Sequence, residues 1–234
     1  RIIDFPLSKR ILFQFGPIRY KYTAKDRAAK QGIGHFIYPR FTRLAHTFPQ
    51  KPTIPELYDL IVKSPTRNEQ IIKDTERCIK EGRTPLVMTK YKSHAAFLFS
   101  RLKDKADHVF LLQGGQSRKE NDRIRAAMAA VPPDESIILV AIGKYIGEGF
   151  NYPRLDTLLL AMPISWQGNV EQYAGRLNRD YRTKKDVIIF DYIDAHIPTL
   201  EKMYHKRLTT YKRIGFSLKT DLTDTANVPN AIFA

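Results

Sequence analysis

The 234-residue sequence is poor in acidic residues, in cysteine and in long apolar runs. Its 24 Asp and Glu face 39 Lys and Arg, and the resulting net charge of +15 favours polyanionic partners: nucleic acid first, anionic membrane surfaces second. Cys78 is the only cysteine, which excludes an intrachain disulfide. CxxC and HExxH patterns are absent, which argues against a structural zinc site. No stretch of about 18 apolar residues occurs, as a transmembrane helix would need.

Two further absences concern processing and phosphate binding. The first residues, RIIDFPLSKR, lack a Met, an apolar signal core and a small-residue cleavage site. We therefore expect a cytoplasmic protein, and a piece of a longer one. The sequence also lacks GxxxxGK[ST], the loop that cradles nucleotide phosphates, so the chain alone is not expected to hydrolyse ATP. The pair Asp134-Glu135 precedes an apolar run, whereas a magnesium-binding acidic pair should follow one.

The first 65 residues differ in composition from the rest of the sequence. They hold 12 Lys and Arg against 4 Asp and Glu, together with many prolines and aromatic residues. Alternation over 18–23 predicts a half-buried strand, and 33–41 is a second strand candidate, ended by Pro39. We interpret residues 1–65 as short strands and loops that form a basic N-terminal extension or an interlobe connection, placed at a sheet edge or extending away.

From residue 66 to residue 216, short apolar runs alternate with amphipathic segments. The runs are nearly continuous, which is typical of strands buried on both faces of a parallel sheet. They span 85–89, 109–113, 137–142, 157–162 and 187–192, and helices are predicted over 67–81, 91–104, 118–130, 168–179 and 198–214. This alternation predicts an α/β domain: a doubly wound parallel sheet of five or six strands with helices on both faces. Residues 217–234 form a C-terminal tail. Cys78 lies on the apolar face of the first helix, which favours core packing over a reactive thiol.

The segment QYAGRLNRD (172–180) presents two arginines from one helix. Gln172, Arg176 and Arg179 are spaced by four and three residues and share a face. A planar guanidinium suits the charge that spreads over a transferring phosphoryl group. An ordinary solvated helix face explains the same pattern.

Glycine-containing turns follow the other predicted strands. Gly147 and Gly149 bracket Glu148 in GKYIGEGFNYPRLD (143–156), and Gly114-Gly115 follow the run at 109–113. Thr89 and Lys90 end the run at 85–89, Ser93 is placed to cap the next helix, and Ser117 begins a capping box. Such turns expose N–H groups to phosphate, although each alone is equally typical of a strand–turn–helix unit without a ligand.

Taken in order, these segments over residues 67–214 resemble motifs IV to VI of the C-terminal RecA-like lobe of superfamily 2 helicases of the DEAD/DEAH type. The resemblance is closest to restriction-subunit-like members, in which GEGF, PRLDTL, a Trp-containing turn (Trp166) and QYAGR follow one another. It implies that Arg179 is an arginine finger and that Arg176 and Gln172 contact the γ-phosphate or the attacking water. It also implies ATP contacts at Gly147, Glu148, Gly149 and Asn151, and nucleic-acid backbone contacts at Thr89, Lys90, Gly114, Gly115, Gly143 and Lys144.

The implied function is that of the second motor lobe of an ATP-dependent helicase or translocase on DNA or RNA. ATP and Mg²⁺ would be bound mainly by the N-terminal lobe, which this chain lacks. Two residues depart from the family pattern: Ile142 stands where a phosphate-contacting Thr is usual, and Asn151 stands where a ribose-contacting Asp is common. They keep open the alternative of a non-catalytic nucleic-acid-binding module. A phosphosugar or nucleotide enzyme of flavodoxin-like topology would need a catalytic set that the sequence lacks.

Overall fold

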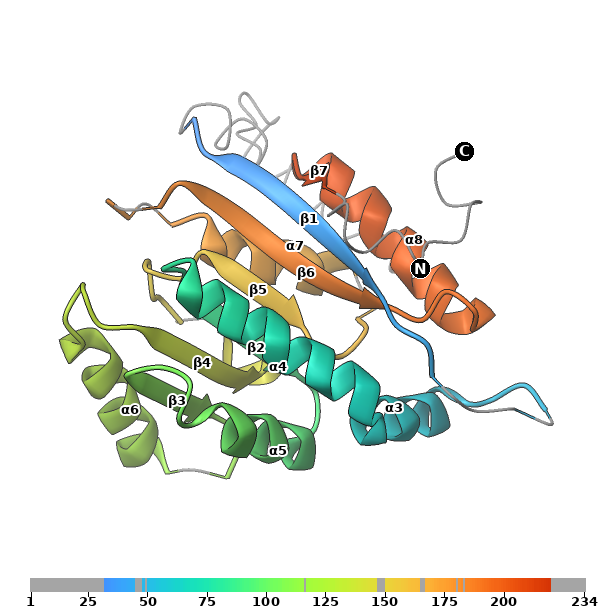
Figure 1. Cartoon of the computed structure of the whole chain (residues 1–234), viewed down its shortest axis with the longest axis horizontal. Helices are drawn as coiled ribbons and strands as arrows, with labels where there is room; N and C mark the ends of the chain where they lie inside the picture. Colours follow the sequence, from blue (N-terminus) through green and yellow to red (C-terminus); the bar gives the residue numbers. More distant parts are fainter. Residues whose placement is uncertain are drawn as a thin grey trace, which may run out of the picture.

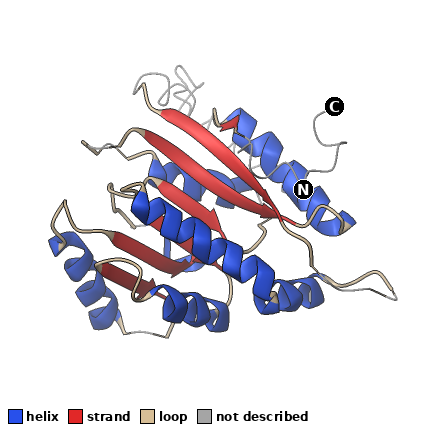
Figure 2. Cartoon of the chain, viewed as in Figure 1, coloured by secondary structure: helices blue, strands red, loops and turns tan. Residues whose placement is uncertain are grey.

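A computed structural model describes residues 32–44, 48, 50–115, 117–146, 150–164, 167–179, 181–182 and 184–219. Seven strands form one sheet in the order β3-β4-β2-β5-β6-β1-β7, and every neighbouring pair is parallel. The sheet and its helices are shown in Figure 1 and, by secondary structure, in Figure 2. The strands are β1 (Gly34–Phe41), β2 (Pro85–Thr89), β3 (His108–Leu112), β4 (Ile137–Ile142), β5 (Thr157–Leu160), β6 (Asp186–Ile193) and β7 (Ser217–Leu218). The predicted fold class is confirmed.

Six α-helices accompany the sheet within the described residues. They are α3 (Ile54–Lys63), α4 (Pro65–Lys80), α5 (Lys92–Leu102), α6 (Arg118–Ala130), α7 (Gln167–Leu177) and α8 (Pro198–Arg213), with a short 3-10 helix η1 (Gly143–Ile146) after β4. No helix among these residues is both long and apolar enough to cross a membrane.

The sheet is buried on both faces, as the continuous apolar runs predicted. Leu86 and Met88 of β2 face the core layer shared with α6, α7 and α8, whereas Val87 faces the layer shared with α4 and α5. Cys78 of α4 is fully buried in this second layer, and burial raises the pKa of its thiol far above the ordinary value. Cys78 is therefore a packing residue, as predicted.

The N-terminal zone contributes two elements to this body. Strand β1 pairs with β6 over eight residues, from Gly34↔Asp186 to Phe41↔Ile193, so the sheet has more strands than the five or six predicted. Pro39 does not end β1: it lies inside the strand, which continues to Phe41. The strand predicted at 18–23 lies outside the described residues.

Helix α3 was missed, because its segment sits among the prolines and aromatics that suggested loops. Its start carries a capping box: Thr53 Oγ1 accepts from the Glu56 N–H at 3.5 Å, and Glu56 Oε2 accepts from the Thr53 N–H at 2.7 Å. Leu57, Tyr58 and Ile61 pack in a third apolar cluster with Met162 and the start of α8. Helix α3 therefore lies at the carboxyl ends of β5 and β6.

The predicted helix caps had two outcomes. Ser117 caps α6 as predicted, and its Oγ accepts from the Glu120 N–H at 3.1 Å. Ser93 does not cap α5: the helix begins at Lys92, its N-cap is Tyr91, and no side chain caps it. The Ala95 N–H already bonds the Tyr91 carbonyl at 2.9 Å, so helical hydrogen bonding starts before Ser93.

Candidate nucleotide and nucleic-acid interface

Three loops proposed to contact nucleic acid follow adjacent strands. In the sheet register Thr89 of β2 is opposite Ile142 of β4, and Leu112 of β3 is opposite Ala141. The loops after these strands, which contain Lys90, Gly114-Gly115 and Gly143-Lys144, therefore lie along one edge of the sheet. The side chain of Lys144 is outside the described residues.

The glycines of this edge stand where neighbours approach closely. A Cβ on Gly114 would clash with the hydroxyl of Tyr145, and one on Gly143 would clash with the hydroxyl of Tyr173. Gly115 has a φ of +93°, a left-handed conformation that side chains rarely adopt, and its virtual Cβ lies 3.0 Å from Lys92 Nζ. The tight turns predicted from the sequence are thus required by packing as well.

Thr89 is directed into the protein. It is 4% exposed, and its hydroxyl lies 2.8 Å from Nδ1 of the fully buried His94. His94 Nε2 lies 2.9 Å from Asn68 Oδ1, so Nε2 carries the proton and Nδ1 accepts from the Thr89 hydroxyl. Desolvation, reinforced by the charge of Arg67, lowers the pKa of His94 from 6.5 to about 4, so the ring is neutral near pH 7. Thr89 therefore has no hydroxyl proton left to donate to a phosphate.

Lys90 is exposed at the same strand end and is framed by two aromatic rings. Its ammonium lies 4.7 Å from the ring centroid of Tyr58 in α3 and 5.8 Å from that of Tyr91. Cation–π contacts of this kind hold an ammonium without removing its charge. Tyr58 comes from the helix that sequence reasoning missed, although the Thr53–Glu56 capping signal was present.

The proposed ATP residues divide between described and undescribed positions. Gly147, Glu148 and Gly149 lie outside the described residues. Asn151 is exposed in the loop between η1 and β5, one residue after the buried Phe150. The Phe150 carbonyl accepts a hydrogen bond from Arg176 Nη1 at 3.0 Å, which joins the loop to α7.

Helix α7 carries Gln172 and Arg176, both partly exposed, but not Arg179. The prediction of one helix through residue 179 was wrong, since α7 ends at Leu177 and Arg179 lies exposed in the bend that follows. The next residue, Asn178, is buried, and its Oδ1 lies 2.9 Å from His35 Nε2 of β1. Gly175 faces open space, because nothing lies within 4 Å of its virtual Cβ.

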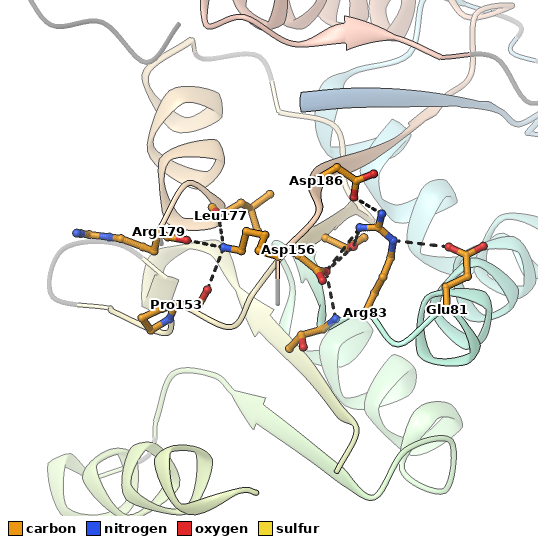
Figure 3. A network of polar contacts seen from close by, with 10 residues as sticks. Glu81, Arg83, Pro153, Asp156, Leu177, Arg179 and Asp186 are labelled. Atoms are coloured by element: carbon orange, nitrogen blue, oxygen red, sulfur yellow. Dashed lines mark hydrogen bonds and ion pairs between the residues drawn. The ribbon is translucent and has the colours of Figure 1, made fainter. Parts of the chain in front are cut away.

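A polar network at the amino ends of β5 and β6 was not found by sequence reasoning (Figure 3). Lys184 Nζ donates to three carbonyls: Leu177 at 2.6 Å, Arg179 at 2.8 Å and Pro153 at 2.9 Å. Beside it, Arg83 forms an ion pair with Asp186 and lies 3.9 Å from Asp156 Oδ1. Burial raises the pKa of Asp156, while the Thr157 hydroxyl opposes that shift by donating to its carboxylate. In the sequence these residues resemble ordinary surface charges, and no motif marks them.

Among the residues that the structure describes, no group of three or more His, Cys, Asp or Glu is arranged so that it could hold a metal ion. The side chains of Gln172 and Arg176 on α7 carry amide and guanidinium N–H groups, which can donate hydrogen bonds to an anion.

In fold, the chain is similar to the second RecA-like lobe of superfamily 2 helicases. T4 UvsW aligns with 81% of this chain at a TM-score of 0.62 and 21% identity, and the match covers 41% of UvsW. The type ISP restriction-modification enzyme LlaBIII, solved bound to DNA, aligns with 92% of this chain at a TM-score of 0.61 and 10% identity, covering 17% of that enzyme. DEAD-box helicase domain 2 of Mss116p, solved bound to an RNA duplex, aligns with 80% at a TM-score of 0.53 and 13% identity, covering 64% of its chain.

Similar sequences occur in viral proteins. Protein 108L of Invertebrate iridescent virus 3 is 40% identical over 83 residues, which are 35% of this chain and 73% of 108L, so the chain belongs to the family of 108L. The protein named "Putative helicase 161L" of Invertebrate iridescent virus 6 is 42% identical over 84 residues, 35% of this chain and 17% of 161L. Transcript termination protein A18 of Fowlpox virus (strain NVSL) is 24% identical over 139 residues, 58% of this chain and 29% of A18. No family model matches the sequence.

Proposed function

We propose that the chain is the second motor lobe of an ATP-dependent nucleic-acid helicase or translocase. The carrying observation is that one connection, from Gly143 to Asp156, contacts α7 twice: Tyr173 packs on Gly143, and Arg176 bonds the Phe150 carbonyl. The start of this connection lies beside the candidate nucleic-acid loops, and its later part contains Asn151. A displacement of α7 on nucleotide binding would therefore also move this connection, and with it the loops that are candidates for nucleic-acid contact.

On the nucleotide side, Arg179 and Arg176 donate hydrogen bonds to anionic phosphate oxygens. Arg179 is exposed, and the open space at Gly175 leaves room beside α7 for a ligand held by another lobe. ATP with Mg²⁺, bound mainly by an N-terminal lobe, supplies the phosphoryl group. The guanidinium of Arg179 stabilises the charge that develops on that group, and Gln172 orients the water.

On the nucleic-acid side, Lys90 is the principal phosphate contact. Lys92 contributes a second ammonium beside Gly115, whose turn exposes backbone N–H groups. That LlaBIII was solved with DNA and Mss116p with RNA supports nucleic acid as the ligand class. The excess of basic residues over the whole sequence supports it as well.

The test is ATP turnover by a full-length protein that contains this chain and an ATP-binding lobe, with and without single-stranded DNA or RNA. We expect turnover that nucleic acid stimulates and that Arg179→Ala lowers roughly 10³-fold or more. Arg182→Ala, at a nearby exposed arginine, is the matched control and should leave turnover unchanged.

A non-catalytic nucleic-acid-binding module is the second candidate. Ile142 and the inward-facing Thr89 favour it, because neither side chain can donate to a phosphate. The two candidates separate cleanly: a full-length protein that binds nucleic acid without hydrolysing ATP would favour the module.

A further inference from the structure

We propose that Lys184 is a positioning residue: it fixes the segment that carries Arg179 against the loop that carries Asn151. This inference rests on the proposed function, since it assigns Arg179 and Asn151 to the nucleotide. Lys184 itself contacts backbone oxygens and is not a catalytic residue.

The ammonium of Lys184 donates to carbonyl oxygens of two separate segments. It has three N–H donors, and three carbonyl oxygens lie within 2.9 Å: those of Pro153, Leu177 and Arg179 (Figure 3). Leu177 is the last residue of α7, where unpaired carbonyls and the negative end of the helix dipole favour a cation. Lys184 therefore closes the helix end and holds the next bend, including the backbone of Arg179.

The Pro153 contact extends this hold to a second segment. Pro153 and Phe150 flank the exposed Asn151, and each offers its carbonyl to a cation: Pro153 to Lys184 and Phe150 to Arg176 at 3.0 Å. Asn151 is thus framed by two bonds from the α7 side of the molecule. The position of Asn151 and the position of Arg179 are coupled through one ammonium.

Lys184 is itself held close to the sheet. It lies two residues before Asp186, the first residue of β6, whose carboxylate forms an ion pair with Arg83. Arg83 Nη1 also donates to the Thr157 hydroxyl at the start of β5, at 3.3 Å. Arg83 therefore joins the amino ends of β5 and β6. This contact fixes the backbone next to Lys184 against the sheet.

The first experiment measures ATP turnover of the full-length protein in a double-mutant cycle. Lys184→Met removes the charge and keeps the length of the side chain, and Lys185→Met, at the exposed neighbour, is the matched control. Because small misplacements of a reacting group cost much rate, we expect Lys184→Met to lower kcat by about 10- to 100-fold, with a smaller change in KM for ATP. In an Arg179→Ala background the same change should lower kcat by less than about 3-fold, since residues that act as a unit are not additive. Lys184→Arg should restore part of the loss.

The second experiment needs no activity. Hydrogen–deuterium exchange of this chain should show faster exchange at residues 150–156 and 177–179 in Lys184→Met, with the apolar strands and Lys185→Met unchanged. If Lys184→Met does not fold, Lys184→Gln, which keeps one amide donor, replaces it in both experiments.

Two results would overturn the inference: a kcat of Lys184→Met equal to that of Lys185→Met, or an equally large loss in the presence and absence of Arg179. Failure of the proposed function looks different, because Arg179→Ala alone would then retain turnover within a few-fold of the parent and the inference would fall with it.

Discussion

Arginines occupy two contrasting regions of this molecule. Arg207 of α8 and Arg67 of α4 are buried with their carboxylate partners Asp191 and Asp194, and the side chains of both pairs are 1% exposed. Arg179 and Arg182, after α7, are exposed. Arginine thus forms buried ion pairs in one region and exposes its guanidinium to solvent in the other.

The two regions differ in what each guanidinium contacts. Arg207 makes two hydrogen bonds to Asp191, at 2.8 and 2.9 Å, and a third to the Ile164 carbonyl at 3.0 Å. Tyr211 donates to the same carboxylate at 3.1 Å. A buried charge without such partners would be very costly, whereas an exposed guanidinium keeps water and can exchange it for an anionic ligand. Substitutions in the two regions should therefore separate activity from stability.

The largest expected effect is that of Arg179→Ala on ATP turnover in the full-length protein. If Arg179 is an arginine finger, turnover should fall roughly 10³-fold or more, while thermal stability stays nearly unchanged. Arg179→Lys should rescue poorly, because an ammonium lacks the planar fork. Steady-state kinetics with melting curves measure both quantities, and turnover within a few-fold of the parent would return Arg179 to the class of solvated surface residues.

Arg207→Met should show the reverse behaviour. It leaves Asp191 buried without its cation, and breaking such a pair costs about 3–5 kcal/mol of the free energy of unfolding. Arg213→Met on the same helix is the control: Arg213 is 55% exposed in its ion pair with Glu171, and the change should cost less than about 1 kcal/mol. Urea denaturation measures both, and equal costs would show that burial does not distinguish the two arginines.

The apolar strands and helices of the fold were predicted well from the sequence. The predicted bounds of the strands at 85–89 and 137–142 match the structure, and those of the other three predicted strands differ from it by at most two residues. The agreement is good because a run buried on both faces is continuous and short. The positions of helices α4 to α8 followed from their apolar spacing, although α7 ends at Leu177 and Ser93 does not cap α5. The order of the glycine turns and of QYAGR located the loops and α7.

The buried ion pairs and polar contacts were not predictable from one sequence. The partners of the buried pairs are far apart along the chain, 127 residues for Arg67 and Asp194, and arginine is ordinarily a surface residue. The same holds for Thr89, whose hydroxyl is taken by His94, and for Lys184, which donates to backbone carbonyls without a sequence signature. Local pattern fixes which face of an element is apolar, but not which distant charge completes it.

The pH dependence of stability should report on the buried histidine. The pKa of His94 falls from its ordinary value of 6.5 to about 4 in the folded protein, because burial and the charge of Arg67 disfavour the protonated form. Below pH 6.5 the unfolded chain takes up a proton that the folded chain refuses, so the free energy of unfolding falls as pH decreases toward 4. The loss is at most about 1.4 kcal/mol per pH unit. His94→Gln should remove this part of the slope, whereas His205→Gln, at an exposed histidine, should retain it; identical slopes for both variants would contradict the neutral His94.

The smallest expected effect concerns Lys90 and nucleic acid. An isolated lobe makes few phosphate contacts, so its affinity for single-stranded nucleic acid should be weak, about 1 to 100 micromolar, and should fall as salt rises. Lys90→Gln removes one ammonium from the carboxyl end of β2 and should weaken binding a few-fold. It should reduce the slope of log K against log salt by about 0.7, the value for one single-strand phosphate contact. Lys80→Gln, at the exposed end of α4, is the control of equal charge change away from the candidate loops. Fluorescence anisotropy over a salt series measures both variants. If Lys80→Gln changed the slope as much as Lys90→Gln, the binding would follow net charge alone, and the strand-end loops would not be the site.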